Sequence, residues 1–293
     1  MLITNSLISV LILSYNHCNF VEDCILSAIN QQENNIGIEV IIIDDGSTDG
    51  TVEIIERLAT KHLEIQFLKQ PHEGVNAIAR NFNRLISLAK GKYISFLSSD
   101  DVYLPHRFEK QIELMEIDQQ VQFVYSNGLN CKNGISDKSV MNFASHEALR
   151  SENPVIVYKF ITENIPLIFI QGILIRNSFL TNFKPFNENL IADDWVFNIL
   201  IFKRLLEANL CYCFLDISVF IRNVLPERTS GNFRVHWQRI EQVIDTYIAD
   251  KNKNPLKKKT LLRFIKRSFN KHSISNVIYF YFIFLKIFLS KKK

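Results

Sequence analysis

Short apolar runs alternate with amphipathic stretches along the first 125 residues of the chain. Continuous apolar, β-branched runs at 8–13, 39–43 and 93–97 predict strands that are buried on both faces, and 65–69 predicts a shorter strand. Between these runs, apolar residues recur at helical spacing in 19–32, 51–59 and 74–89. Alternation of strand and helix with short connections predicts an α/β fold with a doubly wound, mostly parallel central sheet flanked by helices.

The pattern is less regular after Pro105. It predicts a helix at 106–117, a strand at 121–125, a loop at 127–137, a helix at 160–165 and a strand at 169–175. Asp193-Asp194-Trp195 opens an apolar helix at 196–206, and the two acids suit its positive N-terminal end. A last strand is predicted at 210–222, followed by a polar loop at 225–232.

Polar and acidic residues stand where the predicted strands end. Ser14-Tyr15 follows the first strand, Asp44-Asp45 the second, and Ser99-Asp100-Asp101 the strand at 93–97. Ligands of open α/β sheets bind just beyond the carboxyl ends of strands, and adjacent acids repel each other unless a positive group lies beside them. A divalent metal on a phosphorylated ligand is one such group, because Mg²⁺ and Mn²⁺ take oxygen ligands. An acidic turn or helix cap is the simpler alternative for Asp100-Asp101.

Composition and charge narrow the class of protein. The 293 residues are 47% hydrophobic, which suffices for a sizeable core. The five cysteines have no metal-site spacing and no basic leader precedes the apolar run at 7–13, so a reducing, cytoplasmic location is expected. Residues 251–293 hold 13 Lys/Arg and no Asp/Glu, against 21 basic and 30 acidic residues in 1–250. An acidic body does not suggest nucleic acid as a partner, whereas the basic tail suggests an anionic one.

The C-terminal tail combines this charge with an aromatic run at 277–289. The run is shorter than the roughly 20 apolar residues of a membrane span. A short apolar helix with basic flanks favours an interfacial anchor on anionic lipid, here on the cytoplasmic face of the inner membrane. A C-terminal helix packed on the domain is the alternative.

The ordered motifs resemble the inverting glycosyltransferase family 2, whose members have the GT-A fold and use nucleotide-sugar donors. The resemblance rests on Ser9–Asn16, Glu39–Asp49, Gly74–Asn81, the Asp100-Asp101 strand end with Pro105, and Asp193-Asp194-Trp195. It covers about 1–110 strongly, extends through about 220, and is absent from the tail. It implies a GT-A-type fold with a helical C-terminal tail, in which 1–105 forms the nucleotide-sugar-binding half and 106–250 the acceptor-binding half of the catalytic domain, followed by the tail at 251–293.

The resemblance also implies roles for individual residues. Ser14, Tyr15 and one acid of Asp44-Asp45, with Asp45 the first choice, would lie beside the base of the donor. Arg80 would approach the base or the diphosphate, and Ser99 would contact the donor. Asp100, with Asp101 beside it, would hold Mn²⁺ or Mg²⁺. Asp194 would be the general base, with Asp193 as the runner-up. The alternatives are ordinary turn and cap residues, and for Arg80 an ion pair on its own helix face.

Two departures from the family pattern stand out. Ser98 occupies the first position of the usual Asp-x-Asp at the metal strand, so one metal or ribose ligand is replaced by a hydroxyl. The Arg-x-His that often holds the diphosphate is Arg222-Asn223-Val224 here, so either Arg222 or Arg228 would serve.

The function that the resemblance implies is transfer of a sugar from a nucleotide-sugar, with a UDP-sugar expected, to an acceptor hydroxyl. The expected acceptor is a glycan or lipid-linked sugar in bacterial surface polysaccharide synthesis. A catalytically degenerate nucleotide-sugar-binding protein is the alternative, motivated by Ser98. A nucleotidyltransferase would need a Gly-rich, basic loop after the first strand, and residues 14–17 do not form one.

Overall fold

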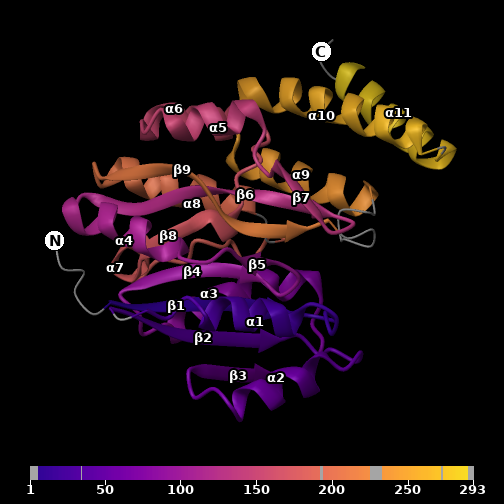
Figure 1. Cartoon of the computed structure of the whole chain (residues 1–293). Coiled ribbons are helices and arrows are strands. Elements are labelled where there is room, and N and C mark those ends of the chain that lie inside the picture. Colours follow the sequence, from indigo (N-terminus) through magenta and orange to yellow (C-terminus); the bar gives the residue numbers. More distant parts are fainter. Residues whose placement is uncertain (1–5, 34, 192–193, 225–232, 272, 290–293) are drawn as a thin grey trace. The chain divides into compact units, whose positions relative to one another are not determined.

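The computed structural model describes residues 6–33, 35–191, 194–224, 233–271 and 273–289, which fold into two compact units (Figure 1). Unit 1 comprises Met1–Tyr158 and Pro166–Val224, and unit 2 comprises Lys159–Ile165 and Leu225–Lys293. Residues 192–193 and 225–232 lie outside the described part, so the predicted loop at 225–232 cannot be compared with it.

The first half of unit 1 is a parallel sheet. Its strands lie in the order β3-β2-β1-β4, and they are β1 (Ser6–Ser14), β2 (Ile36–Asp44), β3 (Ile65–Lys69) and β4 (Tyr93–Ser98). Val10, Leu11 and Ile12 in β1 are all fully buried, which is why this strand reads as a continuous apolar run rather than an alternating one. The helices α1 (Val21–Ile29), α2 (Thr51–Ala59) and α3 (Ile78–Leu88) connect these strands.

The second half of unit 1 makes the sheet mixed and curled. β8 (Ile173–Arg176) runs antiparallel to β4 and to β6 (Val121–Lys132), and β9 (Cys211–Asn223) runs parallel to β6. Only residues 99–101 separate β4 from β5 (Val102–Tyr103), yet β5 pairs with β9 at the far end of the strand order. The sheet therefore curls, and it brings the carboxyl ends of β4 and β9 together. The α/β fold expected from the sequence is confirmed, with its parallel part confined mainly to β1–β4.

The loop predicted at 127–137 is wrong. β6 continues to Lys132 and turns into β7 (Ile135–Ser139) through Asn133 and Gly134, both with positive φ (53° and 79°), as two-residue hairpin turns require. Gly128 suggested a loop, but a Cβ there would lie 2.4 Å from the ring of Phe220. The residue is a glycine because a neighbouring strand packs against it.

Among the remaining helices of unit 1, those over 107–117 and 194–207 match predicted helices with small shifts, whereas those over 143–150 and 177–180 were not predicted. These helices are α4 (Arg107–Ile117), α5 (Phe143–Arg150), α7 (Asn177–Leu180) and α8 (Asp194–Glu207), with 3-10 turns η1 (Val75–Ala77) and η2 (Ile170–Gly172). Phe197 of α8 packs on Phe96 of β4 with ring centroids 5.4 Å apart, and both rings are fully buried. This contact fixes the start of α8 close to the end of β4.

Unit 2 is helical, as expected for the C-terminal region. Its helices are α9 (Phe233–Tyr247), α10 (Asp250–Asn270) and α11 (Ile274–Leu289), while α6 (Pro154–Glu163) belongs partly to each unit. Phe264 of α10 anchors the unit, with ring centroids 6.3 Å from Trp237 of α9 and 5.1 Å from Phe280 of α11. None of the helices in the described ranges has the length and apolarity that crossing a bilayer requires.

Candidate active site

Three strand ends meet at one polar edge of the parallel sheet. The strand register places Ser14 of β1 opposite Asp44 of β2, and Leu13 opposite Ser98 of β4. Side chains beyond these ends tie the loops together: the amide of Asn16 donates to Ser47 Oγ at 2.8 Å, and His17 Nδ1 lies 2.7 Å from Ser99 Oγ. The edge predicted from the sequence is therefore assembled, because parallel strands end on the same side.

The two acids after β2 are held by different partners. Asp44 is fully buried and accepts hydrogen bonds from the Ser47 amide at 2.8 Å and from Ser47 Oγ at 2.6 Å. These bonds close the turn that carries the next residues. Asp45 instead faces the loop that follows β3. Its Oδ1 accepts from Gln70 Nε2 (2.8 Å) and from the Glu73 amide (3.2 Å), and its Oδ2 accepts from the Gly74 amide (3.0 Å).

His72 completes this cluster and was not anticipated. Its Nδ1 lies 2.9 Å from the Asp45 carbonyl oxygen and 3.0 Å from Asp45 Oδ2. Its ring stacks on Tyr15 with centroids 4.2 Å apart and an interplanar angle of 18°, and both side chains are partly exposed. Gly46 permits this approach, because its φ is +78° and a Cβ there would lie 2.5 Å from the His72 amide nitrogen. In the sequence, His72 could have been found from its position in the turn after the third predicted strand, which ends at the same edge of the sheet.

Arg80 stands near the start of α3, with a side chain that is 54% exposed. It forms an ion pair with Glu73, which lies in the loop before the helix rather than on the helix itself. Because Glu73 also donates its amide to Asp45, the cation lies on the Asp45 side of the edge.

Asp100 and Asp101 are nearly completely buried at the end of β4. Asp101 Oδ1 accepts from the amide of Asn223 at 2.9 Å, and its Oδ2 accepts from Gln171 Nε2 at 3.0 Å. Gln171 Nε2 also lies 2.8 Å from Ser98 Oγ, so Ser98 and Asp101 share one donor. Asn223 Nδ2 donates to the Asp100 carbonyl oxygen at 2.6 Å. Two segments distant in the sequence, at Gln171 and Asn223, thus fix the geometry of this acidic pair.

The acidic pair has an electrostatic effect on its surroundings. Burial, reinforced by the negative charges of Asp101 and Asp100, holds the pKa of the Cys24 thiol well above its usual value. Among the residues described, no group of three or more His, Cys, Asp or Glu side chains could hold a metal on its own. Magnesium in nucleotide sites commonly uses one or two carboxylates and takes its remaining ligands from substrate phosphates and water. Asp100 and Asp101 fit that pattern.

Gln171 and Asn223 were missed in the sequence. Gln171 is the one polar side chain within the apolar run Phe169–Ile175. A lone polar group in a buried run indicates a side chain that makes a specific polar contact. Asn223 lies in the Arg222-Asn223-Val224 stretch that had been singled out for its arginine. The side chain of Arg222 donates to Asn130 Oδ1 at 3.1 Å and lies over the ring of Phe169 at 4.8 Å. Its neighbour Asn223 makes the contacts with the two acids. Arg228 lies outside the described residues.

Asp194 is the first residue of α8 and is half-buried. Its carbonyl oxygen accepts from Asn198 Nδ2 at 2.7 Å, and Asn198 also accepts from the hydroxyl of Tyr125 at 2.5 Å. Burial and, secondarily, the negative charge of Asp194 raise the pKa of Tyr125 well above its usual value. Asp193 lies outside the described residues.

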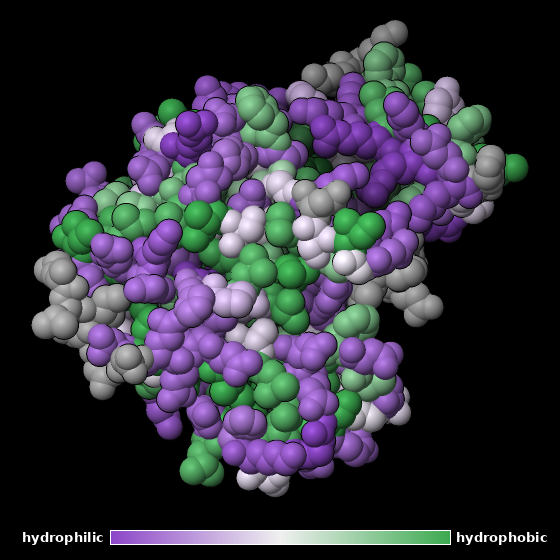
Figure 2. Space-filling model, in the orientation of Figure 1, coloured by the Kyte–Doolittle hydropathy of each residue, from purple (hydrophilic) through white to green (hydrophobic). Residues whose placement is uncertain are grey.

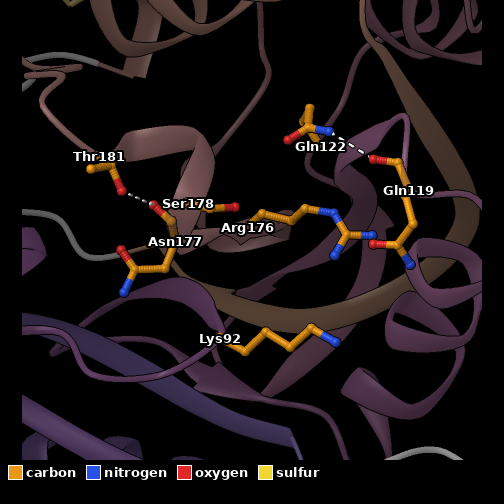
Figure 3. A pocket seen from close by; sticks show the side chains of 7 residues that line it. All are labelled: Lys92, Gln119, Gln122, Arg176, Asn177, Ser178 and Thr181. Carbon is orange, nitrogen blue, oxygen red and sulfur yellow. Dashed lines mark hydrogen bonds between the residues drawn. The ribbon is translucent and has the colours of Figure 1, made fainter.

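A separate cavity of about 520 Å³ lies at the opposite end of β4, where Lys92 precedes the strand (Figure 3). Arg176 lines it, but its Nε donates to the Val121 carbonyl oxygen at 2.9 Å and its guanidinium also contacts Met115. Lys92 pairs with Glu116. The cations of this cavity are therefore engaged by the protein, and it is not continuous with the acidic edge.

Solved structures share the fold. S. aureus TarS 1–349 in complex with UDP-GlcNAc superposes with a TM-score of 0.56 over 84% of this chain and 69% of that chain, at 15% identity. The mannosyltransferase PcManGT from Pyrobaculum calidifontis, in complex with GDP-Man and Mn²⁺, gives a TM-score of 0.58 over 81% of this chain and 63% of that one, at 17% identity. The fold is that of the GT-A glycosyltransferases.

Sequence comparison identifies the family. The model of Glycosyl transferase family 2 matches residues 9–173, more than half of the chain, and the chain belongs to that family. Chondroitin synthase of Pasteurella multocida (strain Pm70) is 36% identical over 124 residues, which are 42% of this chain and 12% of that protein. The Escherichia coli UDP-Glc:alpha-D-GlcNAc-diphosphoundecaprenol beta-1,3-glucosyltransferase WfaP is 39% identical over 121 residues, which are 41% of this chain and 45% of that protein. The chain thus spans less than half the length of either relative.

Proposed function

We propose that the protein transfers a sugar from a nucleotide-sugar to an acceptor hydroxyl, with inversion at the anomeric carbon. The observation that carries this proposal is the convergence of three strand ends at one acidic edge, in a chain of glycosyl transferase family 2. We propose that residues 1–105 bind the donor and residues 106–250 bind the acceptor.

The donor's base would lie against Tyr15, with Asp45 accepting from an imide N–H of the base. The contacts with Gln70, the loop amides and His72 orient the Asp45 carboxylate for this role. Ser14 and Ser99, which are buried at the same strand ends, would lie beside the donor. We propose a UDP-sugar as donor, because a relative is named for UDP-Glc and a structural neighbour holds UDP-GlcNAc. Another neighbour holds GDP-Man, so the base has to be tested directly.

The diphosphate would lie beside Asp100 and Asp101, which would hold Mn²⁺ or Mg²⁺. Such an ion supplies Lewis-acid stabilisation of the departing diphosphate. Asn223 and Gln171 would keep the Asp101 carboxylate oriented while the phosphates bind. Arg80 or Arg222 would add positive charge on the donor side. The presence of Mn²⁺ in the PcManGT complex supports Mn²⁺ as a candidate ion.

The chemical step would be a single displacement. The acceptor oxygen forms a bond to the anomeric carbon, the bond to the diphosphate oxygen breaks, and the nucleoside diphosphate leaves with the electron pair. Asp194 accepts the acceptor's proton, with Asp193 as the second candidate. Because the pKa of an alcohol lies far above that of a carboxylic acid, the proton moves late, as the leaving group departs.

The acceptor that we propose is a glycan or a lipid-linked sugar in bacterial surface polysaccharide synthesis, reached from the cytoplasm. Support comes from the names of relatives, which include WfaP and the putative teichuronic acid biosynthesis glycosyltransferase TuaG of Bacillus subtilis (strain 168), 36% identical over 109 residues that are 37% of this chain and 42% of that protein.

One observation favours a second candidate, a nucleotide-sugar-binding protein without turnover. Ser98 stands where the family usually has an acid, and its hydroxyl is engaged by Gln171. On this alternative the site binds a donor but cleaves none, and Ser98→Asp changes little.

A donor panel distinguishes these proposals. UDP-, GDP- and dTDP-sugars are incubated with the wild type, with and without Mn²⁺ or Mg²⁺, and release of the nucleoside diphosphate is followed. We expect slow, metal-dependent release from one donor, lost in Asp100→Ala and kept in Asp118→Ala, an aspartate at the end of α4. If calorimetry detects donor binding but no acceptor or metal elicits release, the second candidate holds. Absence of binding on the whole panel would contradict both.

A further inference from the structure

Helix α11 presents a continuous apolar stripe to its surroundings. Ile274, Ile278, Tyr281, Phe282, Phe288 and Leu289 have exposed fractions between 51% and 73%. Their spacing of three, four and seven residues places them on one face of the helix, and Leu285 falls on the same face. On the other side, Phe280 is fully buried against Phe264 of α10. The helix is thus apolar on both sides, although only one side is covered within unit 2.

Helix α10 places positive charge next to this stripe. Leu262 and Phe269 of α10 are exposed, with exposed fractions of 53% and 72%, and the exposed Arg263 and Lys266 lie between them in the sequence. Lys258 lies over the ring of Phe288 at 4.6 Å, which joins the cations of α10 to the stripe of α11. From Lys251 to the last residue the sequence has no acid. Figure 2 shows hydrophobic and strongly hydrophilic residues side by side over α10 and α11.

This combination selects one kind of partner. Protein interfaces are depleted of lysine around their apolar core, and a two-fold contact between copies would bring two cationic borders together. Nucleic acid would bind to the cations but would leave the apolar stripe exposed to water. A bilayer containing anionic lipid can bind both the apolar stripe and the cations, because apolar side chains enter the interface while Lys and Arg reach the headgroups.

We propose that the α10–α11 hairpin binds the surface of an anionic membrane, with α11 lying in the plane of the interface. The helix has 16 residues, about 24 Å at 1.5 Å per residue, so it is too short to span the hydrocarbon core. This surface is independent of the acidic edge of unit 1 and would keep the enzyme where a lipid-linked acceptor is presented.

The test is flotation of the full-length protein with phosphatidylcholine vesicles, with and without 30% phosphatidylglycerol. We expect binding to the anionic vesicles only. Ile278→Ser with Phe282→Ser should abolish it, whereas Phe143→Ser, which changes an 81% exposed aromatic residue of unit 1, should not. Arg263→Glu with Lys266→Glu should weaken binding by at least about fivefold for each charge removed, whereas Lys61→Glu in unit 1 should have little effect.

Two results would overturn the proposal. One is a wild-type protein that stays off anionic vesicles at low salt. The other is equal vesicle binding by the stripe variants and the Phe143 control. Light scattering on the same samples identifies a second copy as the partner if the wild type dimerises and the stripe variants do not. Circular dichroism verifies folding, and donor hydrolysis measured without lipid reports separately on the active site.

Discussion

Gln171 gives the sharpest test of how the acidic edge is built. Its Nε2 is the donor to Asp101 Oδ2 at 3.0 Å and to Ser98 Oγ at 2.8 Å, and both Gln171 and Asp101 are buried. Replacing it by methionine, Gln171→Met, keeps an unbranched side chain of similar length but removes both hydrogen bonds. The carboxylate oxygen of Asp101 then loses a partner that water cannot easily replace.

The size of the effect follows from these contacts. Leaving a buried acceptor without its donor costs about 1–3 kcal/mol, and more for a charged group. Gln171 Oε1 has no hydrogen-bond partner of its own within the described residues, so the substitution also removes one unsatisfied buried acceptor. We therefore expect the free energy of unfolding to fall by about 1–2 kcal/mol, in the lower half of this range. For a domain of this size, each 1 kcal/mol corresponds to about 2–4 °C in Tm.

The assay combines thermal unfolding with metal-dependent donor hydrolysis. Gln171→Met should lower Tm and raise the Mn²⁺ concentration needed for half-maximal release, since the orientation of Asp101 is no longer fixed. Gln66→Met, at an exposed position of β3, is the matched control and should change neither quantity. If Gln171→Met matched the wild type in both Tm and metal requirement, Gln171 would not hold Asp101, and the account of the acidic pair would be wrong.

Three further predictions concern other contacts. His72→Ala removes the ring stacked on Tyr15 and a donor to Asp45, so calorimetry should show about 2- to 10-fold weaker binding of the donor nucleotide; tighter binding would mean that the imidazole occupies the position of the base. Gly128→Ala forces a methyl group into the ring of Phe220 and should cost about 1–3 kcal/mol in denaturant unfolding. Gly134→Ala, where a Cβ meets open space, measures the separate cost of a positive φ. Burial opposes ionisation of Asp49, yet hydrogen bonds from Thr51 and the Cys18 amide outweigh it and lower its pKa to about 2. Because this pKa lies below that of the unfolded chain, the stabilisation is present above about pH 4 and is lost as the pH falls toward 2, so Asp49→Asn should destabilise the protein at pH 7 and not near pH 2.

The parallel half of the sheet and its acidic edge could be predicted because they depend on local patterns. Continuous apolar runs marked the strands β1, β2 and β4, and parallel strands necessarily end on one side. Adjacent acids at those ends could therefore be placed together without knowing any side-chain contact. The prediction for residues 127–132 was wrong because Asn127, Gly128 and Asn130 suggest a turn when considered alone. Their strand conformation is imposed by pairing with β9 across the sheet.

The supporting residues of the site could not be predicted in the same way. Gln171, Asn223 and His72 act on acids that lie 70, 122 and 27 positions away in the sequence. The contacts of Gln171 and Asn223 arise only when the sheet curls and brings η2 and β9 to the end of β4, whereas His72 lies in the loop after β3, beside the end of β2. Neither the spacing nor the type of these residues specifies that approach.

The central claim is an inverting transfer, and the configuration of the newly formed sugar tests it most directly. Proton NMR, recorded while the best α-linked nucleotide-sugar of the panel is being hydrolysed with Mn²⁺, reports the anomer before mutarotation. The account predicts the β-anomer from the wild type, and in Asp194→Asn a rate lower by about 10²–10⁴ with unchanged donor binding. Initial release of the α-anomer, or near-normal turnover by a folded Asp194→Asn protein, would contradict it.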